Sequence, residues 1–185
     1  ICAKYEKGIF VLPFYSIEAL YYHPTVIEFL ARKQSEINGD DHLVSVAMAL
    51  DEAVSIVKSH ADRLVQKVVK KIIRKHIEEQ IPNDDELLLG ENILLHNNAR
   101  EIIDRKRLEI DSAIEQKSWM ALIKNLPVRE TGALESISRN LGFQNRVSYE
   151  KSVRNLLSKD TALLTSIREE FSKLYNQTED VVESI

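Results

Sequence analysis

A long stretch without helix-breaking residues, 42–81, is the feature that most constrains how this chain can fold. It contains neither proline nor glycine, the two residues that interrupt helices most strongly. In its second half the apolar residues recur at spacings of three and four, which is typical of an amphipathic helix. They are Ala61, Leu64, Val65, Val68, Val69, Ile72, Ile73 and Ile77. The stretch predicts one long helix, or two helices with a break near Ser59 and His60.

The first half of the same stretch has a different pattern. From Leu43 to Leu50 apolar residues lie nearly all round a helix, which is typical of a helix buried on every side. We therefore expect this part inside the fold. A helix over residues 25–37 precedes it, with Ile37 on its apolar face and Gly39 as a suitable C-cap residue.

A second long helix is predicted for residues 98–116. Its apolar residues form one stripe, which Lys106 interrupts and from which Leu108 points away. The stripe consists of Ala99, Ile102, Ile103, Ile110, Ala113 and Ile114. Packing this helix antiparallel on residues 61–81 would bury both stripes. The sequence therefore predicts a long antiparallel helical hairpin.

Shorter helices complete the predicted bundle. One over residues 118–126 holds the only tryptophan, Trp119, which we expect in the core. Another is capped by Thr131 and ends at Gly142. The last two cover residues 145–158 and 160–175. Their inward-facing residues are predicted to be Val147, Val153, Leu156 and Leu157, and then Leu163, Leu164, Ile167, Phe171 and Leu174.

The composition agrees with a mainly α fold. Of 185 residues only 5 are glycine and 4 are proline, too few for the many turns of a β-sandwich or barrel, and 44% are hydrophobic, enough for a core. The predicted fold class is mainly α, with one N-terminal strand-helix remnant followed by a helical bundle that contains the long hairpin.

Charge, cysteine content and hydropathy exclude several kinds of protein. A net charge of −4 argues against a chain that binds polyanions over its whole surface. The single cysteine, Cys2, excludes an internal disulfide and suits a reducing cytoplasm, where we expect the protein. The sequence contains no run of about 18 apolar residues, so no membrane span is predicted. Zinc-ligand spacings, a Walker A loop and a nucleophile elbow are absent from the sequence.

A basic stripe runs along the outer face predicted for residues 60–76. Six basic residues and one acid, Asp62, give this segment a local charge of +5. The basic residues are Arg63, Lys67, Lys70, Lys71, Arg74 and Lys75. Such a stripe on an acidic protein is a candidate contact for a phosphate backbone. The alternative is a solvated helix face whose cations pair with Glu78 and Glu79.

The N-terminal stretch contains a candidate metal ligand. An apolar run at residues 9–12 predicts a short strand, which Pro13 ends because proline donates no N–H. Ser16 is a common N-cap, so a helix is predicted to follow with Glu18 in its first turn. A carboxylate between a strand end and a helix N-terminus is well placed to hold a divalent metal.

A structural role for Glu18 is the alternative. The helix dipole alone favours an acid in the first turn. Tyr15 and Tyr22 also lie three and four residues away, where a tyrosine hydroxyl can donate to the carboxylate.

The chain begins at Ile1 and leads into a strand without a preceding partner. Because a lone strand cannot satisfy its own backbone, we expect this chain to be the C-terminal part of a longer protein. We divide it into residues 1–24, the edge of an α/β domain, and residues 25–185, a helical domain.

Arg129 is a further candidate. It follows Pro127 in a predicted loop, from which a guanidinium can bind a phosphate bidentately. The alternative is an ion pair with Glu130, or no specific role.

The run from Leu12 to Leu30, LPFYSIEALYYHPTVIEFL, resembles a segment of the Toprim-containing proteins related to the OLD (overcoming lysogenization defect) nucleases. A second match, residues 126–131 and then 149–151, resembles the helical part after the Toprim core. The resemblance implies that residues 1–24 are Toprim-like and that Glu18, with Ser16 as its matching neighbour, helps form a magnesium site. It also implies an ABC-type ATPase domain or subunit as partner.

These observations predict the C-terminal helical portion of a Toprim-type, metal-dependent nuclease, linked to an ATPase and tied to phage defence. Glu18 would be a catalytic metal ligand, and Ser16 would position it or a water. Arg129 or the stripe from Lys67 to Lys75 would hold nucleic acid, with DNA favoured over RNA. Magnesium is expected only in the intact parent, since one carboxylate cannot build a two-metal site, and this chain alone is expected to be inactive.

A function of another class stays open. The chain is then a helical interaction module without catalysis, whose long hairpin forms a homodimer or docks an ATPase partner.

Overall fold

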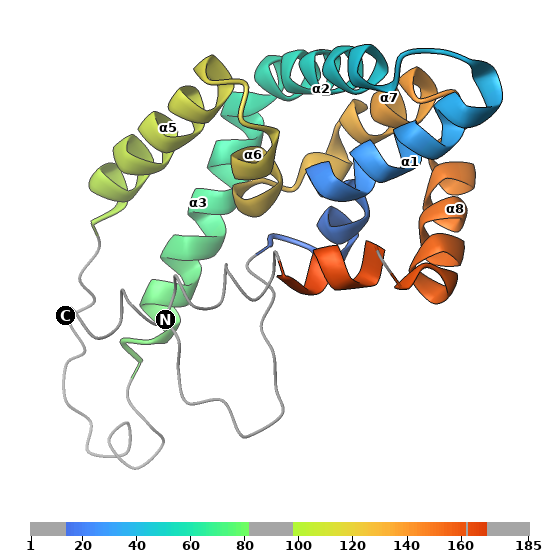
Figure 1. The fold of residues 1–185 in the computed structure, drawn as a ribbon. Helices are drawn as coiled ribbons and strands as arrows, with labels where there is room; N and C mark the ends of the chain where they lie inside the picture. Colours follow the sequence, from blue (N-terminus) through green and yellow to red (C-terminus); the bar gives the residue numbers. More distant parts are fainter. Residues whose placement is uncertain (1–13, 82–97, 162, 170–185) are drawn as a thin grey trace.

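The computed structural model describes residues 14–81, 98–161 and 163–169, and of Ile17 and Glu18 it describes only the backbone. Within these ranges the regular secondary structure is helical throughout (Figure 1). This confirms the predicted mainly α fold class. The strand predicted at residues 9–12 lies outside the described residues. None of the described helices is long and apolar enough to cross a bilayer.

The first part of the chain forms a 3₁₀-helix and three α-helices. These are η1 (Ile17–Tyr22), α1 (Pro24–Asn38), α2 (His42–Ser59) and α3 (Ala61–Glu78). Pro24 starts α1, where its missing N–H is harmless. Gly39 ends α1 with φ 79°, a left-handed conformation that glycine adopts without strain. The break between α2 and α3 falls at His60, one of the two positions predicted.

The other helices among the described residues belong to the second part. They are α5 (Ala99–Glu115), α6 (Trp119–Asn125), η2 (Val128–Glu130), α7 (Ala133–Asn140) and α8 (Arg146–Lys159), followed by helical residues within 161–169. A reciprocal capping box starts α8, in which Asn145 Oδ1 accepts from the Ser148 N–H at 2.9 Å. The four α-helices of this part lie within a few residues of their predicted positions, whereas η2 forms where a loop was predicted.

A compact body is formed by α1, α2, α6, α7 and α8, with α2 packed against both α1 and α7 (Figure 1). Three aromatic residues lie at its centre, and Tyr22, Trp119 and Tyr149 are each almost completely buried. The rings of Tyr22 and Tyr149 stack with their centroids 4.8 Å apart. Trp119 Nε1 donates to the Tyr22 carbonyl at 2.9 Å, and the Tyr149 hydroxyl donates to the Tyr21 carbonyl at 2.9 Å. These contacts fix η1 to α6 and α8, and they confirm Trp119 as a core residue.

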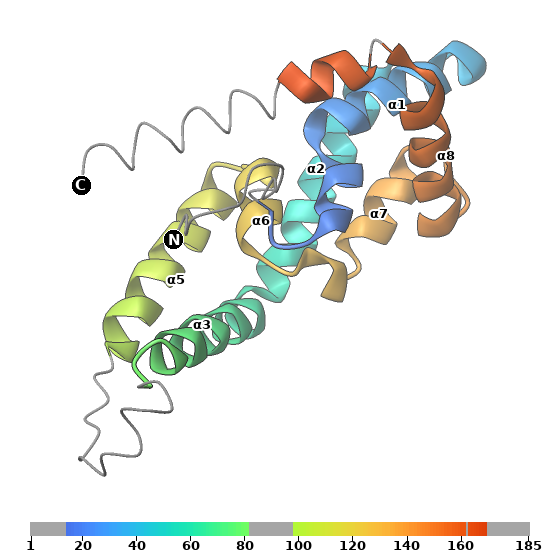
Figure 2. The same cartoon turned by 90° about the horizontal axis from the view of Figure 1, so that it is seen from below.

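The predicted hairpin is formed by α3 and α5, which project together from the body (Figures 1 and 2). At the start of α3, the Asp62 carboxylate pairs with Arg107 at the middle of α5. Further along α3, Ile72 borders the same groove as Ile102, near the start of α5. The two helices therefore run antiparallel, as predicted.

Four burial predictions are wrong, one of them for Ile103 of the predicted α5 stripe, which is 39% exposed. Leu43, Val44 and Met48 are 59%, 55% and 60% exposed, because α1 and α7 cover only the other side of α2. Ile37, in the last turn of α1, is 79% exposed. On α8, Val147 is 69% exposed and Tyr149 is buried in its place.

Candidate nucleic-acid interface

The predicted basic stripe lies on the exposed face of α3. Its opposite face is buried in the hairpin and the adjoining core through Leu64, Val65, Val68 and Val69. All six basic residues of the stripe, Arg63, Lys67, Lys70, Lys71, Arg74 and Lys75, are exposed. The sequence therefore predicted both faces of this helix correctly. We call these six residues the basic face.

One end of the basic face is partly neutralised by Glu130, which belongs to η2. Its carboxylate pairs with Lys67 and with Arg63, the latter at 3.6 Å. Arg63 Nη2 also donates to the Glu130 carbonyl at 3.1 Å. The sequence reasoning missed this role of Glu130, because its partners lie more than 60 residues away and leave no local signal. At the other end, Lys75 pairs with Glu79 at 3.6 Å, one of the two helical pairs predicted.

Within the described residues, the middle of the basic face has no ion-pair partner. Among the described residues, no carboxylate forms an ion pair with Lys70, Lys71 or Arg74. The one acid of the segment, Asp62, pairs with Arg107 across the hairpin, and this contact raises the pKa of the Arg107 guanidinium. Asp62 therefore does not offset the positive charge of the middle.

A cation–π contact joins the N-terminal segment to the basic face. The Lys71 ammonium lies 5.1 Å from the centre of the Tyr15 ring. Such a contact is attractive because the ring face carries negative electrostatic potential. The predicted site residue Ser16 is the next residue along the chain, so the structure brings it close to Lys71.

Ser16 and Glu18 occupy the start of η1. Ser16 is the N-cap, as predicted, and its carbonyl accepts from the Ala19 N–H at 3.0 Å, but its side chain makes no capping hydrogen bond. The backbone of Glu18 lies in the first turn of η1, and its side chain is outside the description. The Tyr22 hydroxyl, considered as a partner for Glu18, lies 3.4 Å from both the Ser138 hydroxyl and a Glu150 carboxylate oxygen.

Arg129 is exposed and belongs to η2, one residue before Glu130. Because consecutive Cα atoms lie about 3.8 Å apart, the anchoring of Glu130 to α3 also holds the Arg129 backbone near the basic face. The Glu130 carboxylate itself is engaged by Lys67 and Arg63. The contacts of Tyr15 and Glu130 thus bring three predicted parts of the site to one region of the molecule: the basic face, Ser16 and Arg129.

A magnesium site needs several ligand side chains close together. Across residues 14–81, 98–161 and 163–169, histidine, cysteine, aspartate and glutamate side chains form no group of three or more that could hold a metal ion. The described side chains therefore do not make a magnesium site by themselves.

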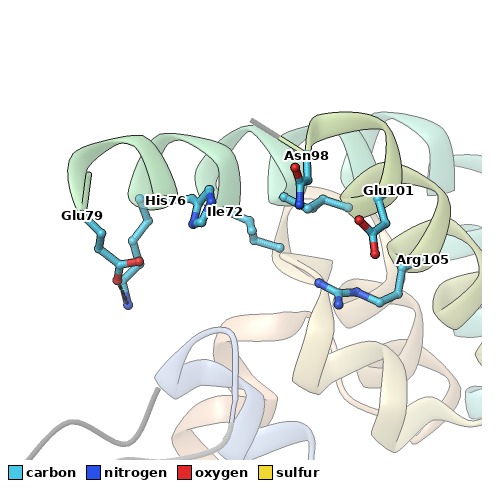
Figure 3. A pocket seen from close by; sticks show the side chains of 8 residues that line it. Ile72, His76, Glu79, Asn98, Glu101 and Arg105 are labelled. Carbon is cyan, nitrogen blue, oxygen red and sulfur yellow. Dashed lines mark ion pairs between the residues drawn. The ribbon is translucent and has the colours of Figure 1, made fainter. Parts of the chain in front are cut away.

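A groove of about 320 Å³ lies between the C-terminal half of α3 and the N-terminal half of α5 (Figure 3). Its lining includes two basic residues, Lys75 and Arg105, and two acidic residues, Glu79 and Glu101. Because Lys75 is already paired with Glu79, this groove is less suited to a polyanion than the middle of the basic face.

The chain was compared with protein-family models, with curated proteins and with solved structures, and none of these comparisons found a match.

Proposed function

We propose that the basic face of α3 binds the phosphate backbone of a nucleic acid, with DNA as the favoured form. The observation that carries the proposal is that Lys70, Lys71 and Arg74 lie on one exposed side of a helix and pair with no carboxylate of the described residues. From Lys67 to Arg74 the face extends about 10 Å along the helix axis, at 1.5 Å per residue. That length matches about three base-pair steps of B-DNA, at 3.4 Å each.

The expected binding is independent of sequence. Lysine and arginine on the basic face can reach phosphate oxygens, which position a protein on nucleic acid without reading bases. In the part of the chain that the structure describes, the aromatic ring that contacts the middle of this face is Tyr15, and Lys71 already engages it. Electrostatic attraction and the release of counterions therefore supply the affinity.

The wider role that we propose rests on the resemblance of residues 12–30 to the Toprim-containing proteins. The chain would be the helical portion of a Toprim-type, magnesium-dependent nuclease that works with an ABC-type ATPase in phage defence. The contact between Tyr15 and Lys71 supports this role, since it sets the segment with Ser16 and Glu18 beside the proposed nucleic-acid surface. Glu18 would contribute a metal ligand to the parent's site, Ser16 would orient it, and Arg129 would hold a phosphate.

The binding proposal is tested by reversing charge in the middle of the basic face. The variant K70E/K71E/R74E is expected to bind a fluorescein-labelled DNA duplex at least about tenfold more weakly in an anisotropy titration at low salt. The matched control K58E/K151E/R154E makes the same change in net charge at exposed positions on α2 and α8. If both variants lose the same affinity, net charge rather than this face determines binding, and the proposal is wrong.

The nuclease proposal needs a separate test, in the full-length parent. Glu18→Ala is expected to abolish magnesium-dependent cutting while DNA binding persists, because the basic face is untouched. Unchanged cutting would remove Glu18 from the chemistry and would leave the binding surface as the only proposed function.

A further inference from the structure

The first two turns of α2 expose an apolar surface that the fold leaves uncovered. Leu43, Val44 and Met48 are each more than half exposed, and Ala47 between them is exposed as well. The opposite side of the helix is fully buried at Ala49, Ala53 and Val57. We call Leu43, Val44, Ala47 and Met48 the α2 patch; α2 lies at the outer edge of the molecule (Figure 1).

The shape of the α2 patch suits another helix. Leu43 with Ala47, and Val44 with Met48, are pairs four residues apart, so they form two parallel ridges on the helix surface. Ala47 has a small side chain, which leaves more room for a large apolar side chain of a partner than a larger residue would. Methionine adapts to the shape of a partner more easily than branched side chains do.

Acidic side chains surround the α2 patch. Asp40 and Asp41 precede it and Glu52 follows it, and all three are exposed. The Asp41 carboxylate caps α2 at the Leu43 N–H, and Glu52 accepts from the Asn140 amide. Within the described residues, no lysine or arginine pairs with any of these three acids. The rim of the patch therefore carries negative charge.

The charged rim argues against a second copy of this chain. In a symmetric dimer with parallel α2 helices, each acid would face its own counterpart. In an antiparallel arrangement centred on the patch, Asp40 and Asp41 would face Glu52, the acid there that no described cation pairs with, since Lys117 pairs with the neighbouring Asp51 at 2.8 Å. Both arrangements set like charges against one another, which disfavours association.

We propose that the α2 patch binds an amphipathic helix of a partner protein, one whose apolar stripe is flanked by lysine and arginine. The stripe would pack on the two ridges of α2, and the basic flanks would meet Asp40, Asp41 and Glu52. This surface is distinct from the basic face of α3, so the inference does not depend on the nucleic-acid proposal.

The test uses two synthetic peptides of about 18 residues, about five helical turns. Both contain the same numbers of leucine and lysine, and only one has them arranged with helical periodicity. By fluorescence titration, the amphipathic peptide is expected to bind the intact chain about tenfold more tightly than the scrambled one.

Two variants of the chain separate the apolar and the charged contributions. L43S/V44S/M48S is expected to weaken binding of the amphipathic peptide by about tenfold or more. D40N/D41N/E52Q keeps the capping and hydrogen-bonding groups and is expected to weaken binding several-fold and to reduce its salt dependence. The control L108S, which removes a 73% exposed leucine from α5, should bind like the unaltered chain.

Two outcomes would overturn the proposal. One is equal peptide binding by the unaltered chain and L43S/V44S/M48S, since the patch would then not be the binding surface. The other is a concentration-dependent mass in analytical ultracentrifugation that L43S/V44S/M48S abolishes, since a second copy would then occupy the patch.

Discussion

The helical body and the α3–α5 hairpin are stabilised in different ways. At the centre of the body, Tyr22, Trp119 and Tyr149 are enclosed, and their polar atoms have specific partners, among them two backbone carbonyls. In the hairpin, aliphatic side chains such as Leu64, Val68 and Ile110 form the buried seam. Leu108 and the cations of α3 remain on the outside.

Because of this difference, we assign stability mainly to the aromatic centre of the body and binding to the outer face of the hairpin. The aromatic centre requires particular side chains, because a buried hydrogen-bonding group without its partner destabilises the fold. The hairpin requires only an apolar stripe on each helix, which leaves the outer face of α3 free to carry charge. We therefore expect substitutions in the centre to change stability, and substitutions on the outer face to change binding.

The largest expected effect comes from removing the tryptophan at the centre. Trp119→Ala deletes a buried ring and leaves the Tyr22 carbonyl without its donor, so the free energy of unfolding should fall by about 3–5 kcal/mol. Urea denaturation followed by circular dichroism measures this. In the hairpin, Ile103→Ala changes a 39% exposed side chain and should reduce stability by less than about 1 kcal/mol. A similar loss of unfolding free energy in both variants would contradict the proposed difference between the body and the hairpin.

A smaller effect is expected from the two central tyrosines at high pH. Burial raises the pKa of the Tyr22 hydroxyl and that of the Tyr149 hydroxyl well above the ordinary value of 10.0. For Tyr149 the neighbouring Tyr22 adds to this rise, and for Tyr22 the Glu150 carboxylate does. Above pH 10 the unfolded chain therefore releases tyrosine protons that the folded chain keeps.

The stabilisation from these tyrosines is present below about pH 10 and decreases as the pH rises. Each tyrosine should lower the free energy of unfolding by about 1 kcal/mol between pH 10 and 11, with the slope approaching about 1.4 kcal/mol per pH unit above that. Tyr22→Phe should reduce the measured slope between pH 10 and 11 by about 1 kcal/mol per pH unit, as seen in urea titrations. An unchanged slope would show that Tyr22 is ionised equally in both states.

The smallest expected change in stability lies where the body meets the basic face. Glu130→Gln removes an exposed pairing with Arg63 and Lys67, so stability should change by less than about 1 kcal/mol. DNA affinity should rise roughly twofold to fivefold, because the negative charge that offsets Arg63 and Lys67 is removed. An anisotropy titration at fixed salt measures this, and a weaker affinity would indicate that Glu130 positions the cations for binding.

The hairpin could be predicted from the sequence because its signal is local. Residues such as Leu64, Val65 and Val68 follow the helical period, and the same period assigns Lys67, Lys70 and Arg74 to the opposite face. A local signal also existed on α8, where Tyr149, Val153 and Leu156 are spaced by four and three. It was obscured because Val147 is more apolar than Tyr149.

Other features could not be predicted, since they depend on residues distant in sequence. The Tyr149 hydroxyl reaches a carbonyl 128 residues away, and Glu130 pairs with a lysine 63 residues away. The α2 patch was predicted to be buried because its residues are apolar. That prediction failed because hydropathy does not tell which neighbouring helices cover a helix face. Only the packing of α1 and α7 on one side of α2 decides that point.

The salt dependence of DNA binding tests the central claim, that the middle of the basic face contacts phosphates. The logarithm of the association constant should fall linearly with the logarithm of salt concentration, by about 0.9 for each phosphate contacted. K70E/K71E/R74E should reduce that slope by about 2.7, since three contacts are lost. K58E/K151E/R154E should keep the slope of the unaltered chain. Equal slopes for the unaltered chain and K70E/K71E/R74E would contradict the account.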